Sequence, residues 1–526
     1  MKLTKIILFL TIIVGFVARI IFINEFPPSL NWDEVSHGYN AYSILKTGKD
    51  EWGNFLPTIF RCFGDFKLPV YIYLTVPSVL LFGLNSLSVR LVSTIAGSLI
   101  SFFIYLILKK VLPKKSFLPL LGAAIFALSP GTIFLSRIAL EANLFLLFFC
   151  ISIYLLIDKK LVTSSLFYGI CLFTYNSSRV LLPFYLILLI FIFIKNKLKI
   201  SSNWYKFIPF VVLAILAIIQ TLDKSGQARY QWVSLLDEGS INRINELRQF
   251  YPRLLINKGT YFVFSATKNY LSHFNPSFLF FNGGSHYQFS LPNFFIISPF
   301  FLPFLLLSIY SLFKNIKNVN YQILLYWLLI SPIPSSITRD APHVLRSIVF
   351  IPIVIIIITI GINLIYKKIP KLTFLFVIFV LLYSQFLFLP KYKSYAIDYS
   401  SSWQYGHEEM ISFLKNNYHN YDQFIITKKY GEPHEFLLFY WPWDPSDYQS
   451  NPSKDWNYHA SWYWIDGFDK FKFVNDWEIK DFTQNIDKTK KTLLITSPNN
   501  YNQDNKLLNT INFLDHTPAF EILEIK

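Results

Sequence analysis

The sequence predicts a polytopic, all-α membrane protein that carries a C-terminal extracytoplasmic α/β domain. Its 526 residues are 53% hydrophobic and 19% aromatic. Only 15% are charged, whereas about 25% are charged in a soluble domain. Long apolar runs recur through the first 390 residues, and lysines cluster in the loops between them. A chain of this composition needs lipid to cover its apolar surface.

The apolar runs are long enough to cross a bilayer. About 20 apolar residues do so as an α-helix, which satisfies its own backbone polar groups. The first run follows Lys2 and Lys5. It is too long for a signal peptide and lacks a small-residue cleavage site, so we interpret it as an anchor. We predict about eleven transmembrane helices, at roughly residues 6–23, 87–108, 117–135, 141–157, 162–176, 180–194, 207–222, 293–313, 321–338, 344–366 and 372–390.

Lysine placement predicts the orientation in the membrane. If the N-terminus is cytoplasmic, every cytoplasmic loop is short and basic, as the positive-inside rule requires. The net charge of +16 then mainly directs topology and does not indicate nucleic-acid binding. The lysines of these loops are Lys109, Lys110, Lys114, Lys115, Lys159, Lys160, Lys195, Lys197, Lys199, Lys314, Lys317, Lys367, Lys368 and Lys371.

The same orientation divides the chain into two domains. Residues 1–390 are predicted to form the transmembrane domain, with large outer loops at 24–86 and 223–292. Residues 391–526 are predicted to form an extracytoplasmic domain of soluble type. Alternating patterns in this tail predict a helix at 406–417 and strands at 424–427, 493–496 and 520–525.

The outer loops are predicted to contain helices of their own. Residues 33–47 begin with two acids and end before Gly48, which predicts a short helix that lies on the membrane surface. The apolar stretch 67–83 carries two prolines, and we interpret it as interfacial. One amphipathic helix is predicted at about 240–258. The three cysteines are too few and too scattered for a disulfide framework, and their spacing fits no metal site.

Candidate catalytic groups first occur in the W-D-E motif, directly after the first apolar run. A carboxylate of Asp33 or Glu34 can act as a general base towards a hydroxyl group. The alternative is that the two acids cap a helix and favour its dipole. Lys67, in F-G-D-F-K-L-P, can bind a phosphate, although a lysine at this place can also contact lipid headgroups.

Three arginines and a histidine recur at later outer boundaries. Arg137 and Glu141 are four residues apart and are predicted to share a helix face, where an ion pair is the structural alternative. Arg179 opens the next outer boundary, where snorkelling is the alternative. His343 and Arg346 follow Pro342, which is predicted to start a helix. Cationic side chains at a helix N-terminus are unfavourable unless an anion is bound there, so we favour a phosphate site.

Together these residues supply a carboxylate and several cations at one membrane interface. Transfer from a phosphate-linked donor needs that combination. The departing phosphate is a good leaving group whose growing charge is stabilised by cations, while a carboxylate takes the proton of the attacking hydroxyl.

The chain resembles the membrane glycosyltransferases of the protein O-mannosyltransferase and aminoarabinose-transferase type, including bacterial members with an outer C-terminal domain. The resemblance implies the GT-C fold. In the membrane part it is carried by W-D-E, N-A-Y-S-I-L-K-T-G, G-D-F-K-L-P-V-Y-I-Y-L, S-V-R-L-V-S, S-R-I-A-L-E-A-N, Y-N-S-S-R-V-L-L-P and P-H-V-L-R. In the tail it is carried by W-Q-Y-G-H-E-E and L-L-F-Y-W-P-W-D-P-S-D-Y-Q.

The resemblance also implies roles for single residues. Asp33 corresponds to the catalytic base, with Glu34 as its neighbour, and Lys67 to a lysine that binds the lipid phosphate. The lysine is followed by Leu68 before the proline, and Phe66 replaces the acid often found before it. The arginine-plus-acid element corresponds to Arg137 and Glu141, and donor-phosphate binding extends to Arg179, His343 and Arg346.

The implied activity is an inverting transfer of a sugar from a polyprenyl-phosphate carrier to a hydroxyl on protein, lipid or glycan. It would take place at the extracytoplasmic face of a bacterial plasma membrane, and neither a cofactor nor a metal is expected. The alternative is a transporter or flippase of a lipid-linked saccharide, which would place polar groups near mid-depth. The apolar runs carry few such groups. Arg19 is an exception, but it lies near enough to the outer end to snorkel or reach a phosphate.

Overall fold

The computed structural model describes residues 2–64, 66–113, 116–195, 204–223, 233–459, 462–487, 489–502 and 505–525. Lys114, Lys115, Lys197 and Lys199, four of the lysines used to predict orientation, lie outside the described residues. The chain forms two compact units: unit 1 contains Met1–Ile21 and Ser93–Leu389, and unit 2 contains Phe22–Val92 and Pro390–Lys526. The first large outer loop, which the sequence analysis grouped with the transmembrane domain, therefore belongs to the same unit as the tail.

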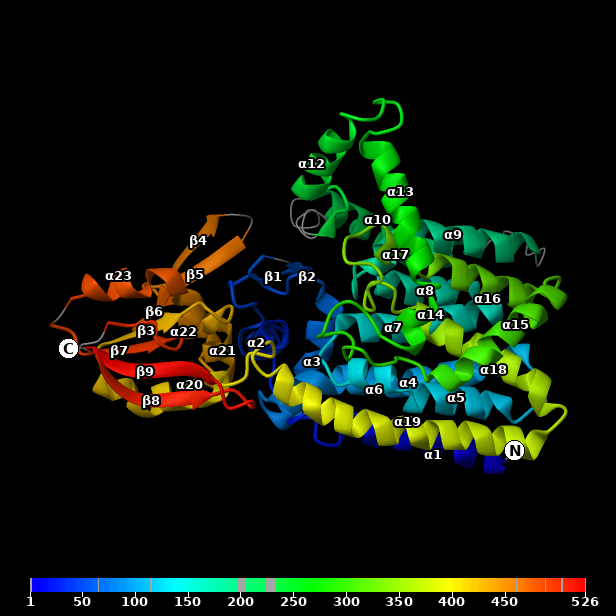
Figure 1. Cartoon of the computed structure of the whole chain (residues 1–526), viewed down its shortest axis with the longest axis horizontal. Helices are drawn as coiled ribbons and strands as arrows, with labels where there is room; N and C mark the ends of the chain where they lie inside the picture. The colour runs from blue at the N-terminus through cyan, green and yellow to red at the C-terminus, as the bar shows by residue number, and fades with distance from the viewer. Residues whose placement is uncertain are drawn as a thin grey trace. The chain divides into compact units, whose positions relative to one another are not determined.

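Unit 1 is a bundle of helices (Figure 1). Its central helix is α18 (Phe350–Tyr366), in which every residue from Phe350 to Ile362 is buried. A helix that is apolar on all sides is covered on all sides by its neighbours. The other helices are α1 (Lys2–Ile20), α4 (Ser86–Val111), α5 (Leu118–Leu128), α6 (Pro130–Ser136), α7 (Glu141–Ile157), α8 (Leu161–Cys171), α9 (Ser177–Lys195), η1 (Trp204–Phe207), α10 (Ile208–Leu222), α12 (Glu238–Leu247), α13 (Lys258–Ser272), α14 (Pro276–Phe280), η2 (Pro299–Phe301), α15 (Leu302–Lys314), α16 (Val319–Ile330), α17 (Ile333–Ser336) and α19 (Pro370–Asp398).

The length and apolar composition of these helices indicate an integral membrane protein. Within the described residues, five helices are long and apolar enough to cross a membrane, and the pair α5–α6, bent by 57°, makes a sixth if it is counted as one span. The other predicted runs overlap shorter helices, among them α7, α8, α15, α16 and α18. The number of about eleven spans therefore stays a prediction.

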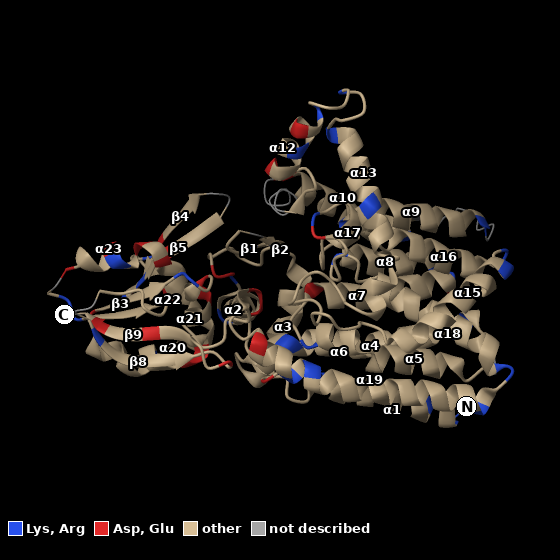
Figure 2. Cartoon of the chain, viewed as in Figure 1, with Lys and Arg blue, Asp and Glu red and all other residues tan. Residues whose placement is uncertain are grey.

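The basic loops gather at one end of unit 1. Figure 2 shows blue segments at the far end of α9, at the turn between α15 and α16 and at the turn between α18 and α19, on the side where the N-terminus lies. The candidate phosphate-binding residues occur at the opposite helix ends, because Arg179 is in the first turn of α9 whereas Lys195 ends it. This separation agrees with the predicted grouping of the loops. The assignment of that end to the cytoplasm stays a prediction.

Two predicted helices differ from the structure. The single helix at 240–258 is wrong, since α12 ends at Leu247 and α13 begins at Lys258. Pro252 lies between them, and proline lacks the amide hydrogen that a continuous helix needs. The helix expected to begin at Pro342 is also wrong, because residues 341–349 form turns and α18 begins only at Phe350.

Unit 2 contains the predicted α/β tail together with the first outer segment. The predicted helix at 33–47 is confirmed as α2 (Trp32–Thr47), and the predicted helix and strands of the tail are confirmed as α20, β3, β7 and β9. The elements of the outer segment are α2, β1 (Phe60–Arg61), β2 (Phe66–Lys67) and α3 (Pro69–Phe82). Those of the tail are α20 (His407–Asn417), η3 (Tyr418–Asn420), β3 (Gln423–Thr427), α21 (Pro433–Tyr440), α22 (Pro445–Ser450), β4 (Asp455–His459), β5 (Trp462–Phe468), β6 (Phe471–Val474), η4 (Asp476–Glu478), α23 (Ile479–Gln484), β7 (Thr492–Thr496), β8 (Lys506–Asn512) and β9 (Pro518–Ile525).

The tail is built on a mixed sheet with the strand order β4-β5-β6-β3-β7-β9-β8. β3 pairs in parallel with both β6 and β7, and the remaining pairs are antiparallel. Ile425, Leu494 and Leu523 from three adjacent strands form a buried cluster with Ile479 of α23. Burial of such side chains stabilises a fold by about 1.5–3 kcal/mol each, so this cluster is a core for the tail.

Helix α2 packs directly against the tail within unit 2. At Gly38 an added Cβ atom would lie 2.4 Å from a ring carbon of Phe439 in α21, so only glycine permits this close approach. The amide of Trp32 donates to Gln404 Oε1 at 2.8 Å, and the Tyr39 hydroxyl donates to the carbonyl of Trp443 at 3.2 Å. The tail therefore positions the helix that carries Asp33 and Glu34.

Candidate functional site

Asp33 and Lys67 form an ion pair in unit 2. Asp33 lies in the first turn of α2, and its side chain is 38% exposed. Lys67 is at the end of β2, which pairs antiparallel with β1, and its side chain is 5% exposed. A buried ammonium group needs an opposite charge to offset its desolvation. The structure thus brings the predicted base and the predicted phosphate-binding lysine together, with the carboxylate partly open to solvent.

Glu34 has a different environment from its neighbour. Its carboxylate accepts from Nε and Nη2 of Arg90 at 2.9 and 3.0 Å, and both side chains are almost completely buried. It also accepts from the amide of Asn31, whose side chain in turn accepts from the amide of Glu34, which completes a capping box. These contacts give Glu34 the capping role that the sequence left as the alternative for both acids. They suit it to hold α2 in place rather than to exchange protons with a substrate.

Arg90 is a partner that the sequence reasoning missed. It lies in the first part of α4 and also donates to the carbonyls of Ile23 and Ser29, each at 2.6 Å. The available signal was an arginine inside an apolar run, because such a charge is usually paired within the protein.

A second group of buried ionisable residues, also missed from the sequence, lies in unit 2. Glu432 Oε2 is 3.5 Å from His434 Nδ1, and Glu435 Oε1 is 3.8 Å from His434 Nε2. Glu51 accepts from Asn40 Nδ2 at 3.0 Å. Burial raises the pKa of Glu51 and that of Glu432 to about 7, and it raises the pKa of Glu435 well above its usual range. Burial also lowers the pKa of His434, so this imidazole is neutral at physiological pH.

Glu432→Gln is expected to stabilise the protein at pH 8 and to have little effect at pH 4.5. Glutamine keeps the acceptor for Trp462 Nε1, which donates to Glu432 Oε1 at 2.6 Å. As the pH rises from 4.5 towards 7, the unfolded chain loses this proton while the folded chain keeps it, so the wild type loses stability. The pKa of about 7 in the folded chain corresponds to about 3 kcal/mol at pH 8. Thermal unfolding of the detergent-solubilised protein across this pH range measures the difference, and a variant that is equally stabilised at both pH values contradicts the prediction.

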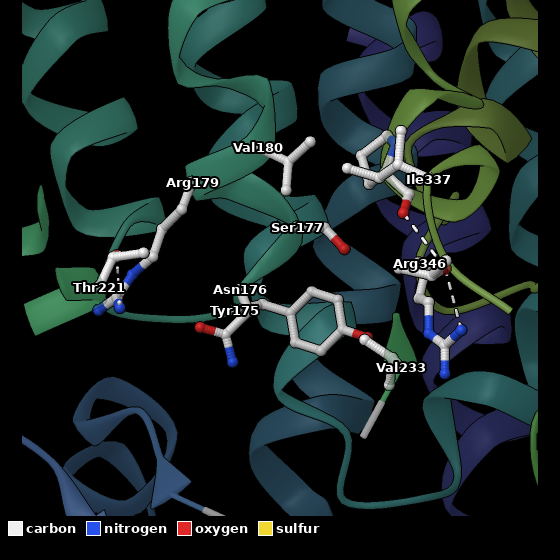
Figure 3. Close-up of a pocket in the computed structure, with 11 residues that line it drawn as sticks. Tyr175, Asn176, Ser177, Arg179, Val180, Thr221, Val233, Ile337 and Arg346 are labelled. Atoms are coloured by element: carbon white, nitrogen blue, oxygen red, sulfur yellow. Dashed lines mark hydrogen bonds between the residues drawn. The ribbon is translucent and has the colours of Figure 1, made fainter. Parts of the chain in front are cut away.

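Unit 1 contains a pocket of about 160 Å³ at the helix ends opposite the basic loops. Arg179 and Arg346 both line it, together with apolar Val180, Val233 and Ile337. In Figure 3 the two arginines lie on opposite sides of the view, with Tyr175 and Ser177 between them. An apolar wall with two cationic groups suits an amphiphile that has an anionic head.

The two arginines are held in the pocket wall by neutral oxygen atoms. Arg179 donates to Gln220 Oε1 at 2.7 Å and to the carbonyl of Leu172 at 3.0 Å, and it makes no ion pair with another described residue. Arg346 donates to Thr338 Oγ1 at 3.0 Å and to the carbonyl of Arg339 at 2.6 Å. These bonds fix both guanidinium groups before a ligand arrives, which is favourable for anion binding.

His343 is close to Arg346 in the chain but lies in an aromatic environment. Its amide donates to Ser335 Oγ at 3.0 Å, and its ring centroid is 5.3 Å from that of Phe289. Because residues 341–349 form turns, neither His343 nor Arg346 lies at the N-terminus of a helix, and the dipole argument for a phosphate site is wrong. Support for Arg346 comes from the pocket instead.

Arg137 and Glu141 do not share a helix face, which corrects the prediction. Arg137 ends α6, Glu141 begins α7, and residues 137–140 interrupt the helix between them. Arg137 donates to the carbonyl of Ala18 at 3.2 Å. Arg19 is fully buried and donates to the carbonyls of Gly15 and Ala127 at 2.8 and 2.7 Å, so the snorkelling interpretation of this residue is also wrong.

The predicted site residues therefore fall into two groups. Asp33, Glu34 and Lys67 belong to unit 2, whereas Arg137, Glu141, Arg179, His343 and Arg346 belong to unit 1. In the described part of the chain, no three His, Cys, Asp or Glu side chains are grouped in a way that could hold a metal ion. The expectation that the reaction needs no metal and no cofactor stays a prediction.

The chain matches no family model, and no curated protein matches it by sequence. Solved structures do match. The apo structure of ArnT from Cupriavidus metallidurans has a TM-score of 0.53 at 10% identity, covering 99% of this chain and 98% of that chain. A structure of the same protein bound to undecaprenyl phosphate has a TM-score of 0.49 at 10% identity, with the same coverage.

A third structure is the archaeal oligosaccharyltransferase AglB from Archaeoglobus fulgidus, in complex with an inhibitory peptide and a dolichol-phosphate. It has a TM-score of 0.47 at 10% identity; 83% of this chain is covered, and the chain spans 63% of the length of AglB. The predicted resemblance is confirmed at the level of the fold: this chain has the fold of ArnT, the GT-C fold of membrane glycosyltransferases.

Proposed function

We propose that this protein transfers a sugar from a polyprenyl-phosphate-linked donor to a hydroxyl acceptor at the extracytoplasmic face of the membrane. The observation that carries the proposal is the ion pair between Asp33 and Lys67. The resemblance assigns these residues to the base and to phosphate binding, and they are in contact although 34 residues separate them in the chain. The fold supports the proposal, since it is also the fold of ArnT.

In the proposed reaction the Asp33 carboxylate accepts the proton of the acceptor hydroxyl. The acceptor oxygen then forms a bond to the anomeric carbon while the bond from that carbon to the phosphate oxygen breaks. The bonding electrons leave with the polyprenyl phosphate, and a single displacement of this kind inverts the anomeric centre. General-base assistance of this kind contributes about 10²–10⁴-fold to the rate.

Each unit by itself contains cationic side chains that are candidates for binding the donor phosphate. Lys67 is the candidate in unit 2. Arg179 and Arg346 are the candidates in unit 1, where the apolar side chains of the pocket suit the first part of an isoprenoid chain. His343, Arg137 and Glu141 are kept as further candidates, and Glu34 is assigned to positioning α2 through Arg90.

A transfer assay with defined donors tests the proposal. Purified protein in liposomes is incubated with a panel of radiolabelled polyprenyl-phosphate sugars and with a mixed set of protein, lipid and glycan acceptors. We expect release of polyprenyl phosphate and labelled acceptor with one donor of the panel. Hydrolysis or movement of the lipid across the bilayer, without any labelled acceptor, contradicts the proposal.

Arg346→Gln is expected to weaken binding of polyprenyl phosphate about 10- to 100-fold, because a hydrogen bond between a charged donor and a charged acceptor contributes about 1.5–3 kcal/mol. The affinity can be measured by titration calorimetry in detergent. Lys109→Gln is the matched control, since Lys109 is an exposed basic residue near the opposite end of unit 1. Normal affinity in both Arg346→Gln and Lys67→Ala contradicts the assignment of the phosphate site.

A further inference from the structure

Helices α12 and α13 form an arm that stands away from the rest of unit 1 (Figure 1). Residues 248–257 connect the two helices at the tip. Four large apolar side chains are exposed there: Phe250 at 79%, Tyr251 at 53%, Leu254 at 84% and Leu255 at 60%. Each such side chain gains about 1.5–3 kcal/mol when it leaves water, so an apolar tip of this size indicates a partner.

The tip has an ordered conformation of its own. Arg248 Nε donates to the carbonyl of Ile256 at 3.0 Å, and the amide of Leu255 donates to the carbonyl of Pro252 at 2.9 Å. Asn257 then forms a capping box with Thr260 at the start of α13. These bonds close the loop while the apolar side chains point outward. The exposure is therefore a feature of a folded tip.

The charges of the arm are all of one sign beyond α12. From Leu247 to Ser272 the chain contains no Asp or Glu, whereas Arg248, Arg253, Lys258 and Lys268 are basic. Apolar side chains among basic ones are typical of elements that lie at the surface of an anionic bilayer. A protein partner would have to bury these charges, whereas a bilayer pairs them with lipid phosphates and keeps them at the aqueous boundary.

The base of the arm is fixed to the bundle at the end where the pocket lies. Asn269 Nδ2 donates to the carbonyls of Ser336 and Thr338, each at 3.3 Å, and the Tyr270 hydroxyl donates to the carbonyl of Leu329 at 2.9 Å. Thr338 also lines the pocket of Arg179 and Arg346.

The arm extends on the side of two helices that expose apolar faces. Ile190 of α9 and Ile219 of α10 are among these exposed side chains. Helix α9 and the segment Tyr205–Leu222, which contains α10, are both long and apolar enough to cross a membrane. In Figure 1 α13 runs across the direction of α9. An arm with this direction, attached at the end of the spans, runs along the membrane surface.

We propose that the tip of this arm, residues 248–258, inserts into the extracytoplasmic leaflet of the membrane that the chain spans. Phe250, Tyr251, Leu254 and Leu255 enter the boundary between headgroups and acyl chains, while Arg253 and Lys258 contact anionic phosphates. The arm is then an interfacial anchor. It keeps the segment around Ser336 and Thr338, to which its base is bonded beside the pocket, at a constant depth in the membrane. This binding does not depend on the proposed transfer reaction.

Spin labelling of the full-length chain in vesicles tests the insertion. Leu254→Cys and, as a matched control on the exposed face of α12, Asn245→Cys are labelled and reconstituted in vesicles of phosphatidylethanolamine and phosphatidylglycerol. The three native cysteines are buried, and the parent chain serves as the blank. We expect the label at 254 to be more accessible to oxygen than to a water-soluble nickel complex, at a depth of about 5–10 Å, and the label at 245 to show the opposite preference.

Two outcomes overturn the proposal. A label at 254 that is more accessible to the nickel complex than to oxygen, as is expected at 245, places the tip in water. A label at 254 that neither reagent reaches places it against protein, either the rest of this chain or a second copy. The role of charge is tested by Arg253→Glu combined with Lys258→Glu, which is expected to move the label at 254 towards water in anionic vesicles; an unchanged depth refutes the proposed contact of these residues with lipid phosphates.

Discussion

Asp33→Asn is expected to lower the rate of sugar transfer about 10²–10⁴-fold while binding of the lipid donor is retained. Asparagine has nearly the same shape but cannot take the proton of the acceptor hydroxyl. Because Asp33 also pairs with Lys67, its replacement leaves the lysine without that partner. Turnover, donor affinity and thermal stability therefore need to be measured on the same preparation.

The matched control for this experiment is Glu25→Gln, which removes an exposed carboxylate from the same outer segment. It is expected to leave turnover unchanged. Unchanged turnover in Asp33→Asn would remove this residue from the role of base. If Asp33→Asn both unfolds and loses activity, whereas Asp33→Glu stays folded and active, the residue would be assigned to stability alone.

Arg90→Met is expected to destabilise unit 2 by about 3–5 kcal/mol, the cost of leaving a buried ion without its partner. The Glu34 carboxylate would remain in the interior without the guanidinium group that donates to both of its oxygens. The carbonyls of Ile23 and Ser29 would also lose their donor. A fall in the apparent unfolding temperature, measured in detergent at a fixed heating rate, checks this expectation.

The double variant Arg90→Met with Glu34→Gln separates the ion pair from the other bonds of Arg90. It is expected to be more stable than Arg90→Met alone, because the uncompensated charge is gone. If the two substitutions destabilise additively, the ion pair contributes nothing and the prediction is wrong. Activity is expected to fall in Arg90→Met as well, since the displaced helix α2 carries Asp33.

The sequence predicted those elements whose beginning and end are marked by local signals such as caps and turns. The α2 helix has two acids at its start and Gly48 at its end, and the structure contains both an Asn31 capping box and a left-handed Gly48. The strands β3, β7 and β9 are short apolar runs between polar turns, so they were also predicted. In contrast, β4 and β5 are dense in tryptophan and tyrosine, and no alternation of apolar and polar residues distinguishes them.

The errors at the site arose where distant contacts override local signals. Pro342 predicts a helix start, yet the bonds of His343 to Ser335 and of Arg346 to Thr338 hold the segment in turns. Arg137 and Glu141 have helical spacing, but the helix is interrupted between them. The partnership of Glu34 with Arg90 joins residues 56 apart, and no spacing rule in one sequence predicts such a pair.

Unit 2 is assembled from two stretches of chain separated by the whole of Ser93–Leu389. During synthesis the segment with α2 emerges early, whereas the last strands that complete its supporting domain are made at the end. Contacts between such distant segments form slowly, because a long loop must close before they stabilise the fold. A nascent chain that stops before β7 already contains the tail residues that contact α2, but it lacks β7, β8 and β9, three strands of the supporting sheet. We therefore expect the tail to hold the acidic helix firmly only after these last strands have been translocated and paired.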